Sequence, residues 1–415
     1  MKVLKFGGTS VGSAQRMKEV AKLITDGERK IVVLSAMSGT TNTLVEISDY
    51  LYKKNPEGAN EIINRLETKY RQHIDELYAT PEYKQKGLEL IKSHFDYIRS
   101  YTKDLFTLFE EKVVLAQGEL ISTAMMNYYL QECGVKSVLL PALEYMRTDK
   151  NAEPDPVYIK DKLQVQLELH PNAEIYITQG FICRNAYGEV DNLQRGGSDY
   201  TASLIGAAVK ASEIQIWTDI DGMHNNDPRV VDKTSPVRHL HFEEAAELAY
   251  FGAKILHPTC IQPAKYANIP VRLLNTMDPT APGTLISNDT EKGKIKAVAA
   301  KENITAIKIK SSRMLLAHGF LRKVFEIFES YQTSIDMICT SEVGVSVSID
   351  NTKHLNEILD DLKKYGTVTV DKDMCIICVV GDLEWENVGF EAKALDAMRD
   401  LSLIHISEPT RLRCI

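Results

Sequence analysis

The sequence lacks an apolar run long enough to cross a membrane, and it lacks an excess of positive charge. Its 415 residues carry a net charge of −8 at pH 7, which argues against a broad nucleic-acid-binding surface. The first thirty residues do not form a signal peptide, because charges at Lys2, Lys5 and Arg16 interrupt any apolar stretch. These absences favour a cytoplasmic enzyme or binding protein with two or three domains and a small-molecule ligand.

A disulfide or zinc framework is also missing from the cysteine pattern. The seven cysteines are odd in number, scattered, and mostly placed in apolar stretches, so we expect them to be small core residues. Cys375 and Cys378 have C-x-x-C spacing, but they lie in an apolar stretch that predicts a strand, where residues three apart face opposite sides. With no second pair or nearby histidine, we interpret them as core residues rather than ligands.

Neither common glycine-rich nucleotide fingerprint is present, G-x-x-x-x-G-K-[ST] or G-x-G-x-x-G. Instead, an apolar strand at Val3–Phe6 leads into Gly7, Gly8, Thr9, Ser10 and Gly12, and a helical pattern follows from Ser13. Glycines let the backbone approach an anion, helix N-terminal N–H groups point at it, and Lys5 supplies a full charge. The segment alone is equally consistent with a phosphate site and with a simple tight turn.

Three further segments place polar groups at helix starts. Arg195-Gly196-Gly197-Ser198-Asp199-Tyr200-Thr201 repeats the glycine pattern; Arg195 suits a carboxylate, whereas Asp199 is either functional or only a helix-capping acid. Ser35–Asn42 offers hydroxyl groups after the second predicted strand. Glu119, which follows a glycine, is as readily a helix-start acid as a partner for a substrate ammonium group.

Two more segments carry charge near predicted turns. Trp217-Thr218-Asp219 ends a predicted strand and is followed by Asn226–Arg229, which is either a polar turn or a nucleotide pocket with Arg229 near phosphates. Phe251–Pro258 places Lys254 at a glycine-associated bend in an apolar context. We interpret His257 as structural and His239 and His241 as alternate positions of a strand, with no metal role.

Short strands alternate with helices from Met1 to about Ser287, which predicts an α/β sandwich around a mainly parallel sheet. Residues 57–112 are charged and helical and are interpreted as a helical insertion, and 279–293 as a connector. The predicted strands are Val3–Phe6, Ile31–Leu34, Ser137–Leu140, Ile175–Thr178, Ile214–Thr218 and Val271–Leu273, and the predicted helices include Ala14–Thr25, Thr43–Lys53, Tyr200–Val209 and Phe242–Tyr250.

A different pattern follows the connector. Predicted strands at Thr305–Ile309, Asp336–Cys339, Val345–Ile349 and Thr367–Val370, with helices at Gly319–Ser330 and Lys353–Lys364, form a small βαββαβ unit. A second such unit begins with a strand at Met374–Val380 and a helix at Phe390–Asp400. Two similar modules behind a catalytic domain suggest regulation by a small ligand. The predicted divisions are a catalytic domain at 1–290, a first regulatory module at 303–371, a partial second module at 372–400 and an atypical tail at 401–415.

Taken together, Lys5–Gly12, Ser35–Asn42, Gly118–Ser122, Arg195–Thr201, Trp217–Arg229 and Phe251–Pro258 resemble the aspartate kinases of the amino-acid kinase superfamily, in order and spacing. The resemblance covers residues 1–290 and implies an amino-acid kinase fold, a three-layer αβα sandwich. It implies transfer of a phosphoryl group from ATP to the side-chain carboxylate of L-aspartate, giving 4-phospho-L-aspartate, the first step toward lysine, threonine and methionine. Mg²⁺ would be held mainly by the phosphates, with no dedicated protein ligands.

The resemblance also implies roles for individual residues. His224 departs from the tyrosine expected at its position in some relatives, which puts its contact in doubt. Asp199 would also orient the two lysines of the site, Lys5 and Lys254. The implied catalytic residues are Lys5, Gly8, Asp199 and Lys254; the aspartate-binding residues are Ser35, Thr41, Glu119, Arg195 and Ser198; the ATP-binding residues are Lys5, Gly7, Gly8, Thr9, Ser10, Thr218, Asp219, His224, Arg229 and Lys254.

The small modules resemble ACT domains, and their motifs are similar to those of lysine-sensitive aspartate kinases. Lysine is therefore the expected inhibitor, with Asp336 and Glu342 as partners for its ammonium groups or as ordinary loop acids. Pairing of ACT modules between chains implies a homodimer or a dimer of dimers. The implied allosteric residues are Met314, Phe320, Leu321, Ser334, Asp336, Thr340, Ser341 and Glu342.

The C-terminal residues depart from the family pattern. Residues 401–415 do not continue the second module, which holds only about half of an ACT domain, so we expect a truncated module with a non-native tail. A bifunctional enzyme with homoserine dehydrogenase is disfavoured because no dinucleotide-binding fold follows. The alternatives are another amino-acid kinase, such as a glutamate or uridylate kinase, and a non-catalytic amino-acid sensor, which the presence of Lys5, Asp199 and Lys254 together disfavours.

Overall fold

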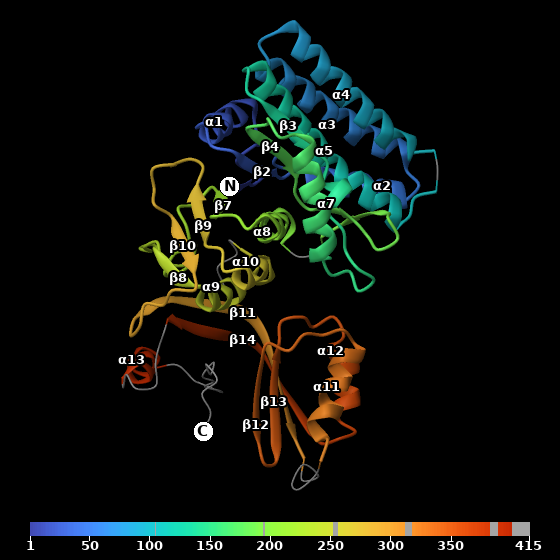
Figure 1. Cartoon of the computed structure of the whole chain (residues 1–415). Helices are drawn as coiled ribbons and strands as arrows, with labels where there is room; N and C mark the ends of the chain where they lie inside the picture. The colour runs from blue at the N-terminus through green and yellow to red at the C-terminus, as the bar shows by residue number, and fades with distance from the viewer. Residues whose placement is uncertain (104, 194–195, 252–255, 312–317, 382–388, 401–415) are drawn as a thin grey trace. The chain divides into compact units, whose positions relative to one another are not determined.

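The computed structural model describes residues 1–103, 105–193, 196–251, 256–311, 318–381 and 389–400. The chain divides into two compact units, Met1–Glu291 and Lys292–Ile415 (Figure 1). Within the described residues, no helix is both long enough and apolar enough to cross a membrane. The division falls near the end of the predicted catalytic region, while the finer domain boundaries stay predictions.

An eight-stranded sheet forms the centre of the first unit, in the order β3-β4-β2-β1-β7-β9-β10-β8. The strands from β3 to β9 in this order are parallel, β10 runs antiparallel to β9, and β8 is parallel to β10. All six predicted strands are confirmed, with ends within two residues. The bounds are β1 Lys2–Phe6, β2 Lys30–Leu34, β3 Ser137–Leu140, β4 Ile175–Gln179, β7 Ile214–Thr218, β8 His239–His241, β9 Val271–Asn275 and β10 Thr284–Ser287.

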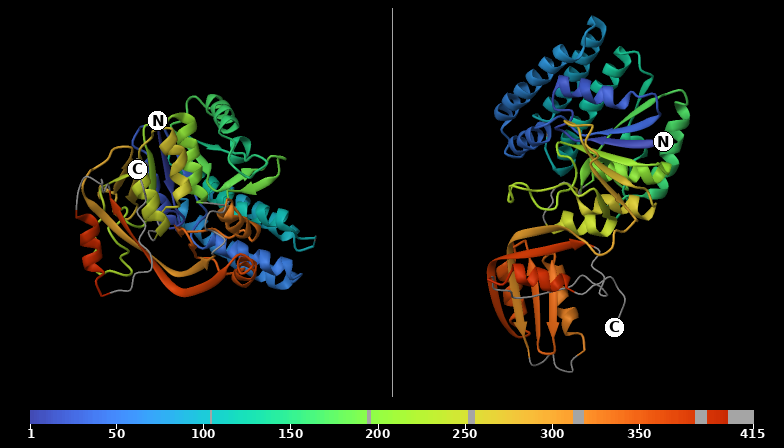
Figure 2. Two further views of the ribbon diagram at one scale, coloured as in Figure 1. Left: turned by 90° about the horizontal axis from the view of Figure 1, so that it is seen from below. Right: turned by 90° about the vertical axis from the view of Figure 1, so that its left-hand side faces the viewer.

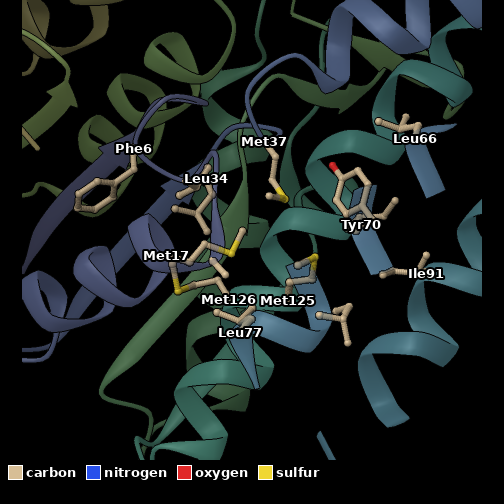
Figure 3. Packing of buried hydrophobic residues seen from close by; sticks show 14 of the residues in the cluster. Phe6, Met17, Leu34, Met37, Leu66, Tyr70, Leu77, Ile91, Met125 and Met126 are labelled. Atoms are coloured by element: carbon tan, nitrogen blue, oxygen red, sulfur yellow. The ribbon is translucent and has the colours of Figure 1, made fainter. Parts of the chain in front are cut away.

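Helices cover one face of this sheet through a shared apolar core. Leu4 and Phe6 of β1 and Leu34 of β2 belong to this core. Figure 3 shows Phe6 and Leu34 together with Met17, Met125 and Met126 from the helices. Alternate strand residues face one side, so these positions define the helix-covered face. The helices that supply the core are α1 Ala14–Ile24, α2 Thr40–Tyr52, α3 Pro56–Leu77, α4 Pro81–Ser100 and α5 Leu108–Glu132.

The opposite face of the sheet is covered by α8 Gly197–Val209, which packs on β1, β2 and β7. Val3 and Lys5 alternate with Leu4 and Phe6, so they point toward α8. The right-hand view of Figure 2 shows blue and teal helices on one side of the strands and a green helix on the other. The three-layer αβα sandwich is confirmed. The remaining elements are α6 Ala142–Tyr145, α7 Pro156–Leu169, α9 Phe242–Phe251, α10 Gln262–Tyr266, the 3₁₀ helix η1 Pro258–Ile261, β5 Ile182–Arg184 and β6 Val190–Asn192.

Two local predictions were wrong, and one of two alternatives for a third feature is excluded. The segment 279–293 is not only a connector, because Thr284–Ser287 forms β10 and pairs with both β9 and β8. Glu119 is not a helix-start acid, because it lies in the middle of the 25-residue helix α5. Cys133 is exposed rather than a core residue, and in the second unit Cys339 and Cys375 are exposed as well. Of the six cysteines that the structure describes, Cys183 and Cys260 are buried as expected and Cys378 is half-buried.

The second unit contains a four-stranded antiparallel sheet in the order β12-β13-β11-β14. Its core lies between this sheet and two helices and includes Ile307, Val324, Val347 and Ile358. The elements are β11 Ile295–Lys310, α11 Phe320–Ser330, β12 Met337–Ser341, β13 Gly344–Ile349, α12 Leu355–Leu362, β14 Thr367–Gly381 and α13 Phe390–Ala397.

Two of these strands are longer than the sequence predicted. β11 joins the predicted strand 305–309 to residues 295–301, and β14 joins both strands predicted between 367 and 380. Asn303 and Asp373 adopt positive φ values of 59° and 56° where the register of the pair shifts. The first half of β11 therefore pairs with the part of β14 that was predicted to begin the second module, which adds residues from before the first module to that sheet.

Candidate active site

The predicted site residues gather at one edge of the eight-stranded sheet. β1, β2, β4 and β7 run parallel, so their carboxyl ends meet at the same edge, where ligands bind in open α/β sheets. The loop Gly7–Gly12 follows β1, the loop Ser35–Gly39 follows β2, and both α2 and α8 begin at this edge.

The glycine loop packs tightly against the loop that follows β2. A Cβ atom on Gly8 would lie 2.8 Å from the carbonyl oxygen of Ala36, so the backbones approach too closely for any other residue. The Ser38 N–H donates to the Gly8 carbonyl at 3.1 Å, which fixes this contact. Lys5 folds over the loop, since its Nζ would lie 3.5 Å from a Cβ on Gly7.

Lys5 and Asp199 form a largely buried ion pair beside the glycine loop. Lys5 Nζ lies 2.7 Å from Asp199 Oδ1, and the side chains are 10% and 15% exposed. The angle is outside hydrogen-bond geometry, so among the described residues Asp199 Oδ1 has an ionic contact but no hydrogen bond. The pair joins the end of β1 to the first turn of α8 and holds a full positive charge beside the loop.

A cavity of about 360 Å³ opens beside this pair. Ser35 Oγ donates to Ser198 Oγ at 2.9 Å, which connects the loop after β2 to α8. Of the predicted residues, the structure brings together Gly8, Ser35, Thr41, Glu119 and Ser198 around this cavity, and it adds Ala36, Met37, Ser38, Gly39, Asn42, Phe181 and Gly197.

Glu119 places a buried carboxyl group in the wall of the cavity. Its Oε1 accepts a hydrogen bond from the Ala36 N–H at 3.1 Å, whereas its Oε2 is buried and accepts none from the described residues. Burial raises the pKa of Glu119 to about 7, against the smaller effect of the Ala36 hydrogen bond. A buried acceptor without a partner costs free energy, so this oxygen is suited to receive a donor from a ligand.

Two helix N-termini point at the same cavity. α2 and α8 each contain 13 residues and begin after Gly39 and Gly196, both at positive φ, and no side chain among the described residues caps either helix. Free N–H groups and the helix dipole attract anions at such ends. Together with Glu119, they fit a small ligand that carries both carboxylate and ammonium groups.

The residues predicted to contact nucleotide are arranged differently. His224 Nε2 lies 2.7 Å from Asp221 Oδ1 and Nδ1 lies 2.8 Å from Thr234 Oγ1, while exposed Arg229 pairs with Asp227 at 2.6 Å. Thr218 ends β7, exposed Asp219 follows it, and Thr9 is half-buried in the glycine loop. Ser10 is fully buried and its hydroxyl shares a 2.7 Å hydrogen bond with Thr276, so we now assign it to packing of the loop rather than to ATP.

Three predicted residues, Arg195, Lys254 and Met314, lie outside the described residues. Phe181 was missed, because a phenylalanine after Gly180 resembles any apolar loop residue. The only sequence signal was its place three residues after the end of the predicted strand Ile175–Thr178, at the sheet edge where ligands bind.

The described allosteric residues lie along one strand and one helix of the second unit. Phe320 is buried and Leu321 is exposed at the start of α11, and Ser334 is exposed. The side chain of Asp336 is buried and pairs with Lys301 at 2.8 Å. Exposed Thr340, Ser341 and Glu342 lie at the far end of β12.

Asp336 and Glu342 therefore do not come together within one chain. Asp336 precedes β12 and Glu342 follows it. At about 3.3 Å per residue this strand separates them by more than about 16 Å, which is too far for the two ammonium groups of one lysine.

Comparisons with known proteins agree with this geometry. Residues 1–275 match the model of the amino acid kinase family. Aspartokinase 1, chloroplastic, of Arabidopsis thaliana is 36% identical over 94% of this chain and 72% of its own length. Lysine-sensitive aspartokinase 3 of Escherichia coli is 34% identical over 92% of this chain and 87% of its own. The crystal structure of E. coli aspartokinase III in complex with aspartate and ADP is similar with a TM-score of 0.84, at 31% identity, over 98% of this chain and 93% of that one.

Proposed function

This chain belongs to the aspartokinases of the amino acid kinase family, and from that membership we propose how its cavity carries out the reaction. It is an aspartate kinase, which phosphorylates the side-chain carboxylate of L-aspartate with ATP. We place L-aspartate in the cavity lined by Gly8, Ser35, Glu119 and Ser198, with the phosphates of the nucleotide over the glycine loop.

The observation that carries this placement is the free Oε2 of Glu119 opposite two uncapped helix ends. The ammonium group of aspartate would donate to Glu119, and its carboxylates would accept from N–H groups at the starts of α2 and α8. Thr41, at the start of α2, and Arg195 are proposed to complete the contacts to aspartate.

The chemistry requires positioning rather than a general base, because the aspartate side chain is already ionised at neutral pH. Lys5 and the N–H groups of Gly7 and Gly8 would stabilise charge on the transferred phosphoryl group. Asp199 would hold Lys5 in place through the 2.7 Å ion pair. Lys254 is proposed to add charge on the nucleotide side.

Thr9, Thr218, Asp219, His224 and Arg229 are proposed to line the nucleotide. Mg²⁺ would enter with it and neutralise phosphate charge. Among the described residues no group of three or more His, Cys, Asp or Glu side chains is arranged to hold a metal, which fits an ion held mainly by phosphate oxygens.

We further propose that lysine inhibits the enzyme through the second unit, because a relative 34% identical over 92% of the chain is named lysine-sensitive. Asp336 and Glu342 lie at opposite ends of β12, so one chain cannot bring both to the same lysine. A lysine that contacts both side chains would take Asp336 from one chain and Glu342 from another. This supports a homodimer or dimer of dimers paired through these modules. The cytoplasmic location remains a proposal from the sequence.

Incubation with aspartate, ATP and hydroxylamine tests the reaction, because hydroxylamine traps the acyl phosphate as aspartyl hydroxamate. We expect hydroxamate with aspartate and none with glutamate. With UMP, whose phosphorylation would give UDP and no hydroxamate, we expect no release of ADP. Well-folded protein that gives no product with any acceptor would favour a non-catalytic sensor. Repeating the assay with lysine, threonine or methionine identifies the inhibitor, and sedimentation with and without lysine tests the pairing of chains.

A further inference from the structure

Phe181 has a strained backbone at the wall of the cavity. It lies between β4 and β5 and has a φ of 69°, a value that a bulky side chain rarely adopts. The Ile182 N–H donates to the Gly180 carbonyl at 2.7 Å, so Phe181 is the central residue of a γ-turn of the rare, positive-φ kind. Such strain persists only where the surrounding structure enforces it, and it is concentrated at functional sites.

Several contacts hold this turn in place. The Phe181 N–H donates to Thr201 Oγ1 at 3.0 Å, and the Phe181 carbonyl accepts from the Leu193 N–H at 2.7 Å. Gly180 packs so closely on α8 that a Cβ there would lie 2.3 Å from Ser198 Oγ. Both backbone groups of Phe181 are thus already bonded, and only its side chain is available to the cavity.

The ring lies against the start of α8. Phe181 lines the cavity beside Gly197 and Ser198, and its Cδ2 would lie 3.6 Å from a Cβ on Gly197. This is the helix end at which the proposed function places a carboxylate of the acceptor, while Glu119 holds the ammonium group. The distance between these two groups fixes which acceptor length fits.

We infer that the Phe181 side chain is a specificity-determining wall that limits the length of the amino dicarboxylate acceptor, and that the γ-turn exists to hold this ring at the start of α8. The inference rests on the proposed function for the location of the acceptor. Thr201 is a positioning residue, since it is fully buried and its hydroxyl accepts from the Phe181 N–H and donates to the Gly197 carbonyl at 3.3 Å.

The test measures kcat/KM for aspartate, glutamate and 2-aminoadipate with wild-type protein, Phe181→Ala and Phe181→Gly. We expect each variant to shift the preference toward longer acceptors by about tenfold per methylene, the usual discrimination of an apolar wall. Glycine adopts positive φ without strain, so a shift shared by both variants reports the ring and not the backbone. A shift in Phe181→Ala alone would overturn the inference, as would an unchanged preference in both.

The matched control is Tyr187→Ala, an aromatic side chain on the hairpin that follows, 78% exposed. It should leave the preference unchanged. Thr201→Val should shift the preference in the same direction by a smaller factor, and Thr201→Ser, which keeps the hydroxyl, should restore it. Equal behaviour of these two variants would contradict the positioning role.

Calorimetric binding of the same acceptors without ATP separates this inference from the proposed function. Wild-type protein that neither phosphorylates nor binds aspartate would contradict the proposed function. An unchanged ratio of acceptor affinities in Phe181→Gly, in protein with a normal melting temperature, would contradict only the role of Phe181.

Discussion

The proposed acceptor side and the proposed nucleotide side of the active site differ in how completely they are formed before any ligand arrives. On the acceptor side, Glu119 and Ser198 are buried, and Ser35 bonds Ser198 across two elements. On the nucleotide side, Asp219 and Arg229 are exposed, and Arg229 is paired with its own neighbour Asp227. The acceptor side is preorganised, whereas the nucleotide side must exchange protein partners for phosphate.

This difference determines how much a substitution should cost. A buried, preorganised group acts in a poorly screened environment, so its loss is felt fully in binding or in the transition state. An exposed pair is screened by water and salt, and its net energy is small. We therefore expect large effects on the acceptor side and small ones around Arg229.

The largest effect is expected for Lys5→Ala. Lys5 lies beside the glycine loop, and its charge is proposed to act mainly on the phosphoryl group in transfer. We expect kcat to fall about 10²–10³-fold, as for the loss of one electrostatic donor in other active sites, with a much smaller change in the KM for aspartate. Initial rates measured over a range of aspartate and ATP concentrations separate the effect on kcat from the effect on KM.

Lys2→Ala provides the matched control, because Lys2 lies on the same strand and pairs with Glu28 at 3.1 Å, but its side chain is 37% exposed, against 10% for Lys5. It should leave kcat unchanged. If Lys5→Ala instead raises KM at normal kcat, the lysine binds the ground state and its proposed role is wrong.

Glu119→Gln should raise the KM for aspartate by about 10²-fold, because a charge-assisted bond to the ammonium group becomes a neutral one. The same change should stabilise the protein. Folded Glu119 titrates near pH 7 and unfolded glutamate near 4.5, so the folded state binds more protons between these values and stability falls as pH rises through them. At pH 8 the gain in unfolding free energy is up to about 3 kcal/mol, and below pH 4.5 it vanishes.

Chemical denaturation at pH 8 and pH 4 measures this gain, with Glu111→Gln on the same helix as control. Glu111 is half-buried in the first turn of the helix, whereas Glu119 is buried, so the Glu111 variant should show a much smaller difference in stability between pH 8 and pH 4. A loss of stability in Glu119→Gln at pH 8 would contradict the burial of an unpartnered carboxylate.

The KM of the wild-type enzyme for aspartate should depend on pH through Glu119, with a smaller change than the Glu119→Gln substitution causes. Burial raises the pKa of Glu119 to about 7, so below this pH the carboxyl group is neutral and binds ammonium poorly. The KM for aspartate should rise roughly tenfold between pH 8 and pH 6, while aspartate itself keeps its charges. Glu119→Gln should show a flat profile, and a wild-type profile equally flat would assign the ammonium contact elsewhere.

The same contrast explains what could be predicted from the sequence. The central strands are apolar runs that end in glycine or hydroxyl residues, so local pattern was enough to place them and the glycine loop. The Lys5–Asp199 pair follows from strand alternation and helix placement once the fold family is recognised. These features depend on short-range rules that leave a signal in the sequence.

The errors come from packing between distant segments. Gly118 suggested a helix start, but it lies within α5. A glycine is needed there because a Cβ would lie 2.8 Å from the Ala36 side chain, a contact that the sequence does not show. β10 was missed because its partners β9 and β8 are supplied by residues outside the glycine- and proline-rich segment. The positive φ of Phe181 depends on contacts with α8 and Leu193, and phenylalanine gives no local signal of it.

The smallest effect is expected for Arg229→Gln. The Arg229 guanidinium must leave Asp227 to reach phosphate. The binding free energy that it gains from the nucleotide is therefore reduced by the energy of the broken ion pair. We expect the KM for ATP to rise no more than about tenfold, with kcat and the KM for aspartate nearly unchanged. Arg65→Gln, which breaks a comparable exposed pair with Glu46, should change neither KM. Asp227→Asn sharpens the comparison, because releasing Arg229 in advance should lower the KM for ATP if the exchange of partners limits binding. If Arg229→Gln raises the KM for ATP as much as Glu119→Gln raises the KM for aspartate, the nucleotide side is preorganised as well, and the contrast between the two sides would fail.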